Sequence, residues 1–328
     1  MRPVEGMEAS SEGSPLKRSR SWVPKALPRL RPYLPLLLVL AVVAPVYDSV
    51  SWLDTTLLFA AFRSLHAEWL ALAAAITVAN IVVMGAYDVI AFRQTRASRG
   101  RRWFNGAVAF VWSNFLTFGP LAGPSVRFWL YRDSVDELAS LRPGIVSVCL
   151  GFGSGLAGWG IGAGLTGYVP PTMQALAVPV IAFAFGLLAT FAAASGLRRW
   201  PVLGSDVSYE SALVMAALGW LDWGLAWAAF AACLLAADAG AAVPGSWSVF
   251  FPGQVIGLLS LVPGGFGGGD AYWILHLVGP APAIVCAVLA YRFLYYLLPW
   301  ALGSLAVLSS AAGPYRHGRS LPAVDLVR

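Results

Sequence analysis

Long apolar runs separated by short polar stretches dominate this chain of 328 residues. A helix that spans a membrane needs about 20 mostly apolar residues, and six uninterrupted runs reach that length. They occupy residues 34–52, 69–92, 143–168, 174–196, 208–237 and 283–311. Two further apolar segments, 104–141 and 247–281, are longer and contain glycine and proline. The pattern predicts an all-α polytopic membrane protein with about six spanning helices.

The basic residues predict the side on which each loop lies, because Lys and Arg accumulate in cytoplasmic loops. Residues 1–33 read as a disordered basic tail, and five arginines lie between 93 and 102. A shorter basic tail, 312–328, ends the chain. With both termini cytoplasmic and the loop 53–68 outside, 20 of the 22 Lys and Arg residues are cytoplasmic or in the cytoplasmic hairpin. The net charge of +6 then reflects topology, so no nucleic-acid partner is expected.

This arrangement makes each interrupted segment begin and end on one side of the membrane. Segment 104–141 returns to the cytoplasmic side and segment 247–281 to the outer side, so both are predicted to be re-entrant helical hairpins. The order span, span, hairpin, span occurs in 34–168 and again, from the opposite side, in 174–311. Inverted repeats with paired broken helices are typical of transporters, whose sites lie at the repeat interface. A membrane domain over 34–311 is therefore expected.

The first hairpin contains SNFLTFGPLAGPSVRFWLYR at 113–132. Pro120, Gly123 and Pro124 predict a turn, which has to line a cavity or lie against protein because lipid leaves backbone groups unsatisfied. A helix restarting near Ser125 would direct its N-terminal amides at that cavity, which favours phosphate. Arg127 follows within a turn and offers a bidentate fork for phosphate oxygens.

The second hairpin contains LVPGGFGGGDAYW at 261–273. Its turn is predicted at Pro263, Gly264, Gly265 and Gly267. Asp270 then begins a helix that continues through residue 277. Its carboxylate could cap that helix, pair with an arginine or meet a cationic headgroup.

Other polar side chains within the apolar runs are candidates for substrate binding. A charged side chain within the bilayer is energetically unfavourable unless it is paired or hydrated, which applies to Asp88, Asp222 and Arg292. For Asp88 the alternative is solvation near the cytoplasmic surface, and for the other two it is structural pairing. Tyr131 and Tyr295 are added as candidates, although interface anchoring or packing would also explain them.

Cofactor and metal chemistry is not predicted. The three cysteines, Cys149, Cys233 and Cys286, lie within apolar runs and are expected to be small buried residues. The three histidines are isolated, and neither glycine-rich turn has the lysine and Ser/Thr of a phosphate-binding loop. With 58% hydrophobic and 12% charged residues, the composition favours a membrane protein over a soluble enzyme.

Four motifs, GAYDVIAF, AGPSVRFWLYR, SLVPGGFGGGDA and VLAYRFLYYLLPW, occur in this order. Together they resemble the membrane domain of the bacterial lysylphosphatidylglycerol synthetase/flippase (multiple peptide resistance factor) family. That family has V-R-Y-R-L-Y after a small-residue turn, a later P-G-G-L-G-x-x-E, and R-x-x-Y-Y-x-x-P in the last span. Here Trp129 replaces the second arginine, Pro124 lies in the turn, and Asp270 replaces the glutamate, which leaves the headgroup preference open.

The resemblance implies a stand-alone flippase in the bacterial inner membrane that moves a phospholipid between leaflets, such as aminoacylated phosphatidylglycerol or a related polar lipid. The soluble aminoacyl-transfer domain of the family is not expected in this chain, so the chain is not expected to be an enzyme.

Two other functions are left open by the sequence. A secondary transporter of a small polar solute would use the same repeats. A non-transporting membrane partner of a separately encoded lipid-modifying enzyme would need no transport at all. The headgroup, the coupling ion and association into homo-oligomers are not decided by the sequence.

Overall fold

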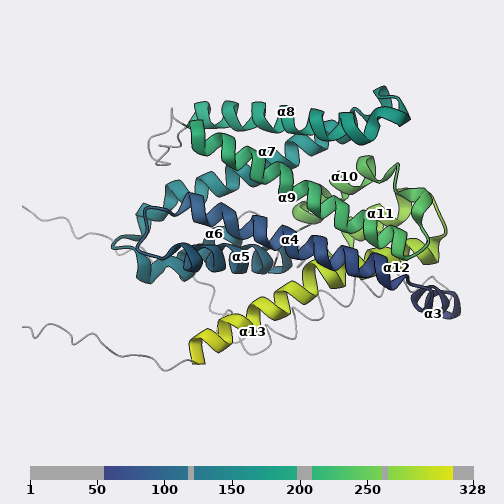
Figure 1. The fold of residues 1–328 in the computed structure, drawn as a ribbon, viewed down its shortest axis with the longest axis horizontal. Helices are drawn as coiled ribbons and strands as arrows, with labels where there is room; N and C mark the ends of the chain where they lie inside the picture. The colour runs from purple at the N-terminus through teal and green to yellow at the C-terminus, as the bar shows by residue number, and fades with distance from the viewer. Residues whose placement is uncertain (1–54, 117–121, 198–208, 261–264, 313–328) are drawn as a thin grey trace, which may run out of the picture. The chain divides into compact units, whose positions relative to one another are not determined.

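The computed structural model describes residues 55–116, 122–197, 209–260 and 265–312, all of which belong to the compact unit Leu40–Arg328. Most of these residues are helical, and none of them forms a strand (Figure 1). Five helical stretches among them are long and apolar enough to cross a membrane. The stretches contain α4 (Ala67–Ala91), α7 (Arg142–Gly164), α8 (Pro171–Leu197), α9 (Tyr209–Ala236), and the continuous run of α12 (Ala281–Tyr291), the π-helical turn η9 (Arg292–Leu297) and α13 (Leu298–Ala312). They match five of the six predicted spans, and the sixth, 34–52, lies outside the described residues, as do residues 1–33 and 313–328 of the two tails.

Shorter helices complete the described chain. They are α3 (Thr55–Arg63), α5 (Arg99–Leu116), α6 (Ala122–Tyr131), α10 (Ser246–Leu259) and α11 (Gly268–His276), with the single turns η3 (Arg132–Ser134), η4 (Leu138–Leu141), η5 (Thr166–Tyr168) and η7 (Gly240–Ala242). The loop that the sequence placed at 53–68 contains the short helix α3. Its sequence TTLLFAAFR is apolar enough to pack against α12, but nine residues are too few to span a bilayer.

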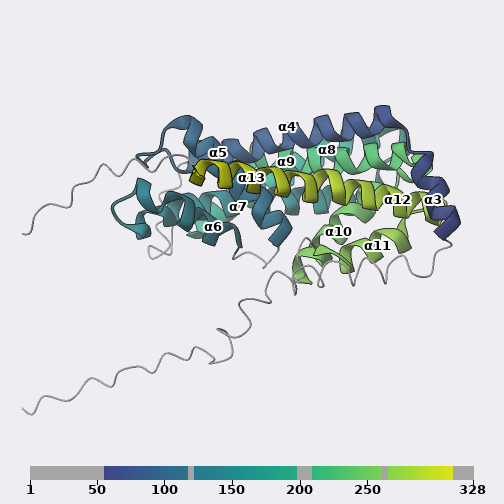
Figure 2. The same cartoon turned by 90° about the horizontal axis from the view of Figure 1, so that it is seen from below.

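Helix α9 is the central helix of the bundle and contacts α4, α7, α8 and α12 (Figures 1 and 2). Its side chains Met215, Phe230, Cys233 and Leu234 are completely buried. A helix that is apolar on every side gains contacts in all directions when other helices surround it. This position explains why the residues near the middle of α9 reach the interior of the protein.

Glycines on α7 allow its close approach to two neighbours. A Cβ atom on Gly155 would overlap the main chain of Gly219 in α9, and one on Gly158 would overlap the main chain of Ala182 in α8. By contrast, Gly160 on the same helix has open space where its Cβ atom would be. Small residues permit such contacts between membrane helices, where packing rather than water exclusion drives association.

Alanine at Gly155 is expected to destabilise the protein by about 1–3 kcal/mol, because the added methyl group has to push α7 away from α9. Alanine at Gly160 is the matched control and should leave stability unchanged or slightly raised, because it gains helix propensity without a clash. Thermal unfolding of the purified variants measures both effects. Equal unfolding temperatures for the two variants would contradict this account of the packing.

Each interrupted segment consists of two helices that pack against each other, α5 with α6 and α10 with α11. The ends of the first segment meet, because the Tyr131 hydroxyl oxygen lies 3.3 Å from the Arg102 carbonyl oxygen. In the second segment the Trp273 indole donates to the Phe250 carbonyl at 3.1 Å. Helix α6 has 10 residues and is about 15 Å long, half of the hydrocarbon thickness of about 30 Å.

The two segments lie at opposite ends of the bundle (Figures 1 and 2). Helices α5 and α6 lie near the end where α4 finishes and α7 begins, and Arg96 there pairs with Asp136 at 2.9 Å. Helices α10 and α11 lie toward the end where α9 finishes and α12 begins. The breaks themselves, 117–121 and 261–264, are outside the described residues, so the predicted turn residues Pro120, Pro263 and Gly264 are too.

Candidate functional site

A cavity of about 340 Å³ lies between the two interrupted segments. Gly123, Pro124 and Arg127 line it from α6, and Gln254 and Gly257 line it from α10. The remaining wall comes from α4, α5, α7, α9, Gly265 and the π-helical turn η9. The two segments that the sequence singled out therefore contribute to one cavity.

A buried ion pair connects the first segment to α4. The Arg127 Nε donates to Asp88 Oδ1 at 2.9 Å, and the two side chains are 4% and 0% exposed. The Tyr131 hydroxyl donates to the other carboxylate oxygen at 3.2 Å. Asp88 is thus fully buried and paired, so the alternative of a solvated carboxylate near the surface does not apply.

Only the Nε atom of the Arg127 guanidinium donates to Asp88 in this pair. Its carbon atom lies 4.8 Å from the centre of the Phe110 ring, and its Nη1 donates to the Gly123 carbonyl at 3.4 Å. Its Nη2 is buried and has no hydrogen-bond partner among the described residues. A buried donor without a partner costs about 1–3 kcal/mol, and this residue lines the cavity. The arrangement suits an anionic oxygen at Nη2.

Small residues at the start of α6 make room for that guanidinium. A Cβ atom on Gly123 would lie 3.2 Å from Arg127 Nη1, closer than most such contacts. Pro124 is tolerated because it lies in the first turn, where its missing N–H is not needed. The sequence predicted the helix to restart near Ser125, and it begins at Ala122.

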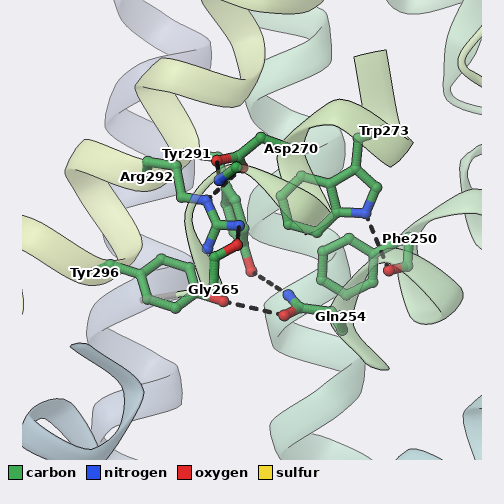
Figure 3. Close-up of polar contacts among 9 residues, drawn as sticks. Phe250, Gln254, Gly265, Asp270, Trp273, Tyr291, Arg292 and Tyr296 are labelled. Atoms are coloured by element: carbon green, nitrogen blue, oxygen red, sulfur yellow. Dashed lines mark hydrogen bonds and ion pairs between the residues drawn. The ribbon is translucent and has the colours of Figure 1, made fainter. Parts of the chain in front are cut away.

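A second buried ion pair connects α11 to η9 (Figure 3). The Arg292 Nε donates to Asp270 Oδ1 at 2.7 Å, with 3% and 6% of the side chains exposed. The guanidinium also donates to the Gly265 carbonyl at 3.3 Å. Aromatic rings surround it, at 4.8 Å for Trp273 and 4.6 Å for Tyr296. Charge and ring contacts together stabilise an arginine away from bulk water.

The backbone conformation before Asp270 requires glycine. Gly265 and Gly267 have φ angles of +66° and +91°, a conformation that L residues with side chains rarely adopt. The Gly267 N–H then donates to Asp270 Oδ2 at 3.0 Å. Asp270 therefore caps its own helix and pairs with an arginine, which are two of the three roles that the sequence left open.

Asp222 differs from the other two buried acids. It is 2% exposed, lines the cavity, and has no Lys, Arg or His nitrogen within 4.0 Å among the described residues. Asn80 of α4 lies beside it and donates to its main-chain carbonyl at 3.1 Å and to the Tyr295 hydroxyl at 2.6 Å. Tyr295, also a sequence candidate, thus belongs to the Asp222 cluster.

The structure brings the sequence candidates into three clusters around one cavity. The clusters are Asp88 with Arg127 and Tyr131, Asp270 with Arg292 and Gly265, and Asp222 with Tyr295. Asn80 and Gln254 were missed. Each is a single amide within an apolar run, and such residues form hydrogen bonds between membrane helices. Gln254 donates to the Tyr291 hydroxyl at 3.3 Å and accepts from the Tyr296 hydroxyl at 3.1 Å (Figure 3).

Cys149 corrects the expectation that all three cysteines are buried. Cys233 and Cys286 are buried, whereas Cys149 of α7 is exposed and lines the cavity. Gly153, one turn further along α7, is also exposed and lines it. These two residues of α7 therefore form an accessible part of the cavity wall.

A membrane-permeable maleimide is expected to modify Cys149 and leave the other two cysteines intact, because only Cys149 is exposed. Mass spectrometry of the folded protein, with a denatured sample as the positive control for all three thiols, gives the modified positions. Modification of Cys233 or Cys286 at the same rate would contradict the burial described here.

Comparison with known proteins gives distant relatives. No protein-family model matches the chain. An uncharacterized protein of Synechocystis sp. is 26% identical over 280 residues, which cover 79% of this chain and 84% of the relative. The phosphatidylglycerol lysyltransferase of Bacillus subtilis is 26% identical over 236 residues, which cover 68% of this chain and 27% of that protein. The chain is therefore a helical membrane protein that is weakly similar to part of a phosphatidylglycerol-modifying protein.

Proposed function

We propose that this protein moves a phospholipid between the two leaflets of a bacterial inner membrane. The observation that carries the proposal is the buried, unpartnered Nη2 of Arg127 at a cavity between the two interrupted segments. A phosphate oxygen would complete the hydrogen bonding of Nη2 while Nε keeps its bond to Asp88, since a guanidinium can donate in two directions at once.

The size and position of the cavity support a lipid headgroup. A volume of about 340 Å³ is at the small end of the roughly 300–1,000 Å³ found for ligand pockets, so it suits a headgroup rather than two acyl chains. Exposed wall residues on α7 support an opening toward the bilayer, through which the acyl chains would remain in lipid. A sealed cavity would favour a polar solute instead.

The arrangement of the interrupted segments supports alternating access. We interpret them as re-entrant hairpins of an inverted repeat that enter from opposite faces, with cytoplasmic termini. Rocking of one repeat against the other would then open the cavity to each side in turn. The similarity to phosphatidylglycerol lysyltransferase favours phosphatidylglycerol, or an amine-bearing derivative of it, as the cargo.

Leaflet exchange in proteoliposomes tests the proposal. Fluorescent lipids labelled on an acyl chain, with glycerol or amine-bearing headgroups, are incorporated in both leaflets, and a membrane-impermeant reductant then bleaches the outer leaflet. Proteoliposomes should bleach beyond the half that empty vesicles lose. Bleaching equal to that of empty vesicles for every headgroup would reject translocation and leave the solute transporter and the non-transporting partner as the remaining functions.

A further inference from the structure

Asp222 is a buried acid without a Lys, Arg or His nitrogen within 4.0 Å in the part of the chain that the structure describes. Of the side chains lining the cavity, Asp222 is the one acid among the described residues, and it lies near the middle of α9. The other two buried acids, Asp88 and Asp270, each have an arginine within 3 Å. A desolvated carboxylate without a counter-ion is strongly disfavoured, so this site requires a positively charged occupant.

The polar groups that reach Asp222 are neutral. The Tyr87 hydroxyl lies 3.5 Å from Oδ2, and the Asn80 amide donates to the main-chain carbonyl of Asp222 at 3.1 Å. The Oδ1 of Asn80 is buried and has no hydrogen-bond partner among the described residues. The cluster thus has more acceptors than donors, as expected of a site that takes up a proton or an ammonium group.

The charged and titratable groups facing Asp222 come from several helices. Tyr87 of α4 and Tyr295 of η9 are neutral neighbours, and Arg127, Arg292 and Cys149 line the same cavity. The described parts of α8 and α10, which also pack against α9, contain no Asp, Glu, Lys, Arg, His, Tyr or Cys. Among the described residues that line the cavity there is no second acid, so one positive charge satisfies the site.

We propose that Asp222 is an exchange site for one positive charge, occupied either by a proton or by the ammonium group of a lipid headgroup. The protonated carboxyl group releases its proton to water in the cavity as the ammonium group forms the ion pair, and the reverse step restores the acid. This inference rests on the proposed lipid translocation. For a lipid whose headgroup carries a net charge of +1, the exchange for one proton moves no net charge, so the inside-negative potential no longer opposes outward movement and a pH gradient can drive it.

Infrared spectroscopy of the purified protein tests the site without transport. The C=O stretching band of a protonated carboxyl group should be present at neutral pH and absent from Asp222→Asn. An amine-bearing phospholipid should remove the band, whereas phosphatidylglycerol should leave it. Glu210→Gln, an exposed acid on the same helix, is the matched control and should retain the band. A band unaffected by Asp222→Asn or by the amine-bearing lipid would overturn the proposal.

Leaflet exchange under an imposed pH gradient tests the coupling. Exchange of the amine-bearing lipid should accelerate in the direction opposite to proton flow, and Asp222→Asn should not respond to the gradient. Lipid exchange that is indifferent to the gradient in the unmodified protein would reject the coupling and leave translocation standing. If no lipid exchanges at all, translocation fails, and the infrared band then decides whether Asp222 exchanges a proton for an amine.

Discussion

Lysine in place of Arg127 is expected to slow leaflet exchange by about 10- to 100-fold, the loss that corresponds to one charge-assisted hydrogen bond of about 1.5–3 kcal/mol. Lysine keeps the positive charge beside Asp88, so the buried carboxylate stays balanced. A lysine ammonium group that bonds to that carboxylate has no second nitrogen to take the place of Nη2, which is the proposed phosphate donor. The loss should therefore fall on transport rather than on folding.

The same exchange assay in proteoliposomes measures this loss, with thermal unfolding as the check on folding. Arg132→Lys is the matched control, because Arg132 follows α6 directly and its side chain is exposed. Its exchange rate should equal that of the unmodified protein. If Arg127→Lys exchanged lipid as fast as this control, Arg127 would have no part in headgroup binding.

Methionine in place of Arg292 is expected to destabilise the protein by about 3–5 kcal/mol, because it leaves the Asp270 carboxylate buried and unpaired. The double variant Arg292→Met with Asp270→Leu should recover most of this loss, since no buried charge remains. Thermal or denaturant unfolding in detergent micelles measures both variants.

The exposed pair between Arg96 and Asp136 provides the control for this second prediction. The side chains of Arg96 and Asp136 are 59% and 91% exposed, so Arg96→Met should cost less than about 1 kcal/mol. A single variant Arg292→Met that is as stable as Arg96→Met would show that the buried pair does not hold α11 to η9.

The apolar pattern predicted most of the fold. Five spans agree with the described helices because each needs only a run of apolar residues of sufficient length. Helix α3 was missed because its nine residues are too short to stand out as a span and pack at the end of the bundle. The two interruptions were predicted because proline and glycine are poor helix formers, and the breaks at 117–121 and 261–264 lie outside the described residues.

The sequence identified most residues of the candidate site but not which of them pair with each other. Asp88 and Arg127 are 39 positions apart and Asp270 and Arg292 are 22 apart, so only the packing of the helices decides which acid meets which arginine. The same reason explains why Asp222 was grouped with the other acids, although it has no arginine partner among the described residues. Asn80 gave a weak signal, because a single amide in an apolar helix has many explanations.

The sidedness of the two interrupted segments is the central claim of this account. Single cysteines placed at Gly100 and Glu137 mark the two ends of the first segment, and those at Ser248 and Gly279 mark the ends of the second, all at exposed positions. Cys149 is first replaced by alanine so that it does not react. An impermeant maleimide applied to vesicles of known orientation should label 100 and 137 from the cytoplasmic side, and 248 and 279 from the opposite side. Labelling of 100 and 137 from different sides, or of all four positions from one side, would contradict the account.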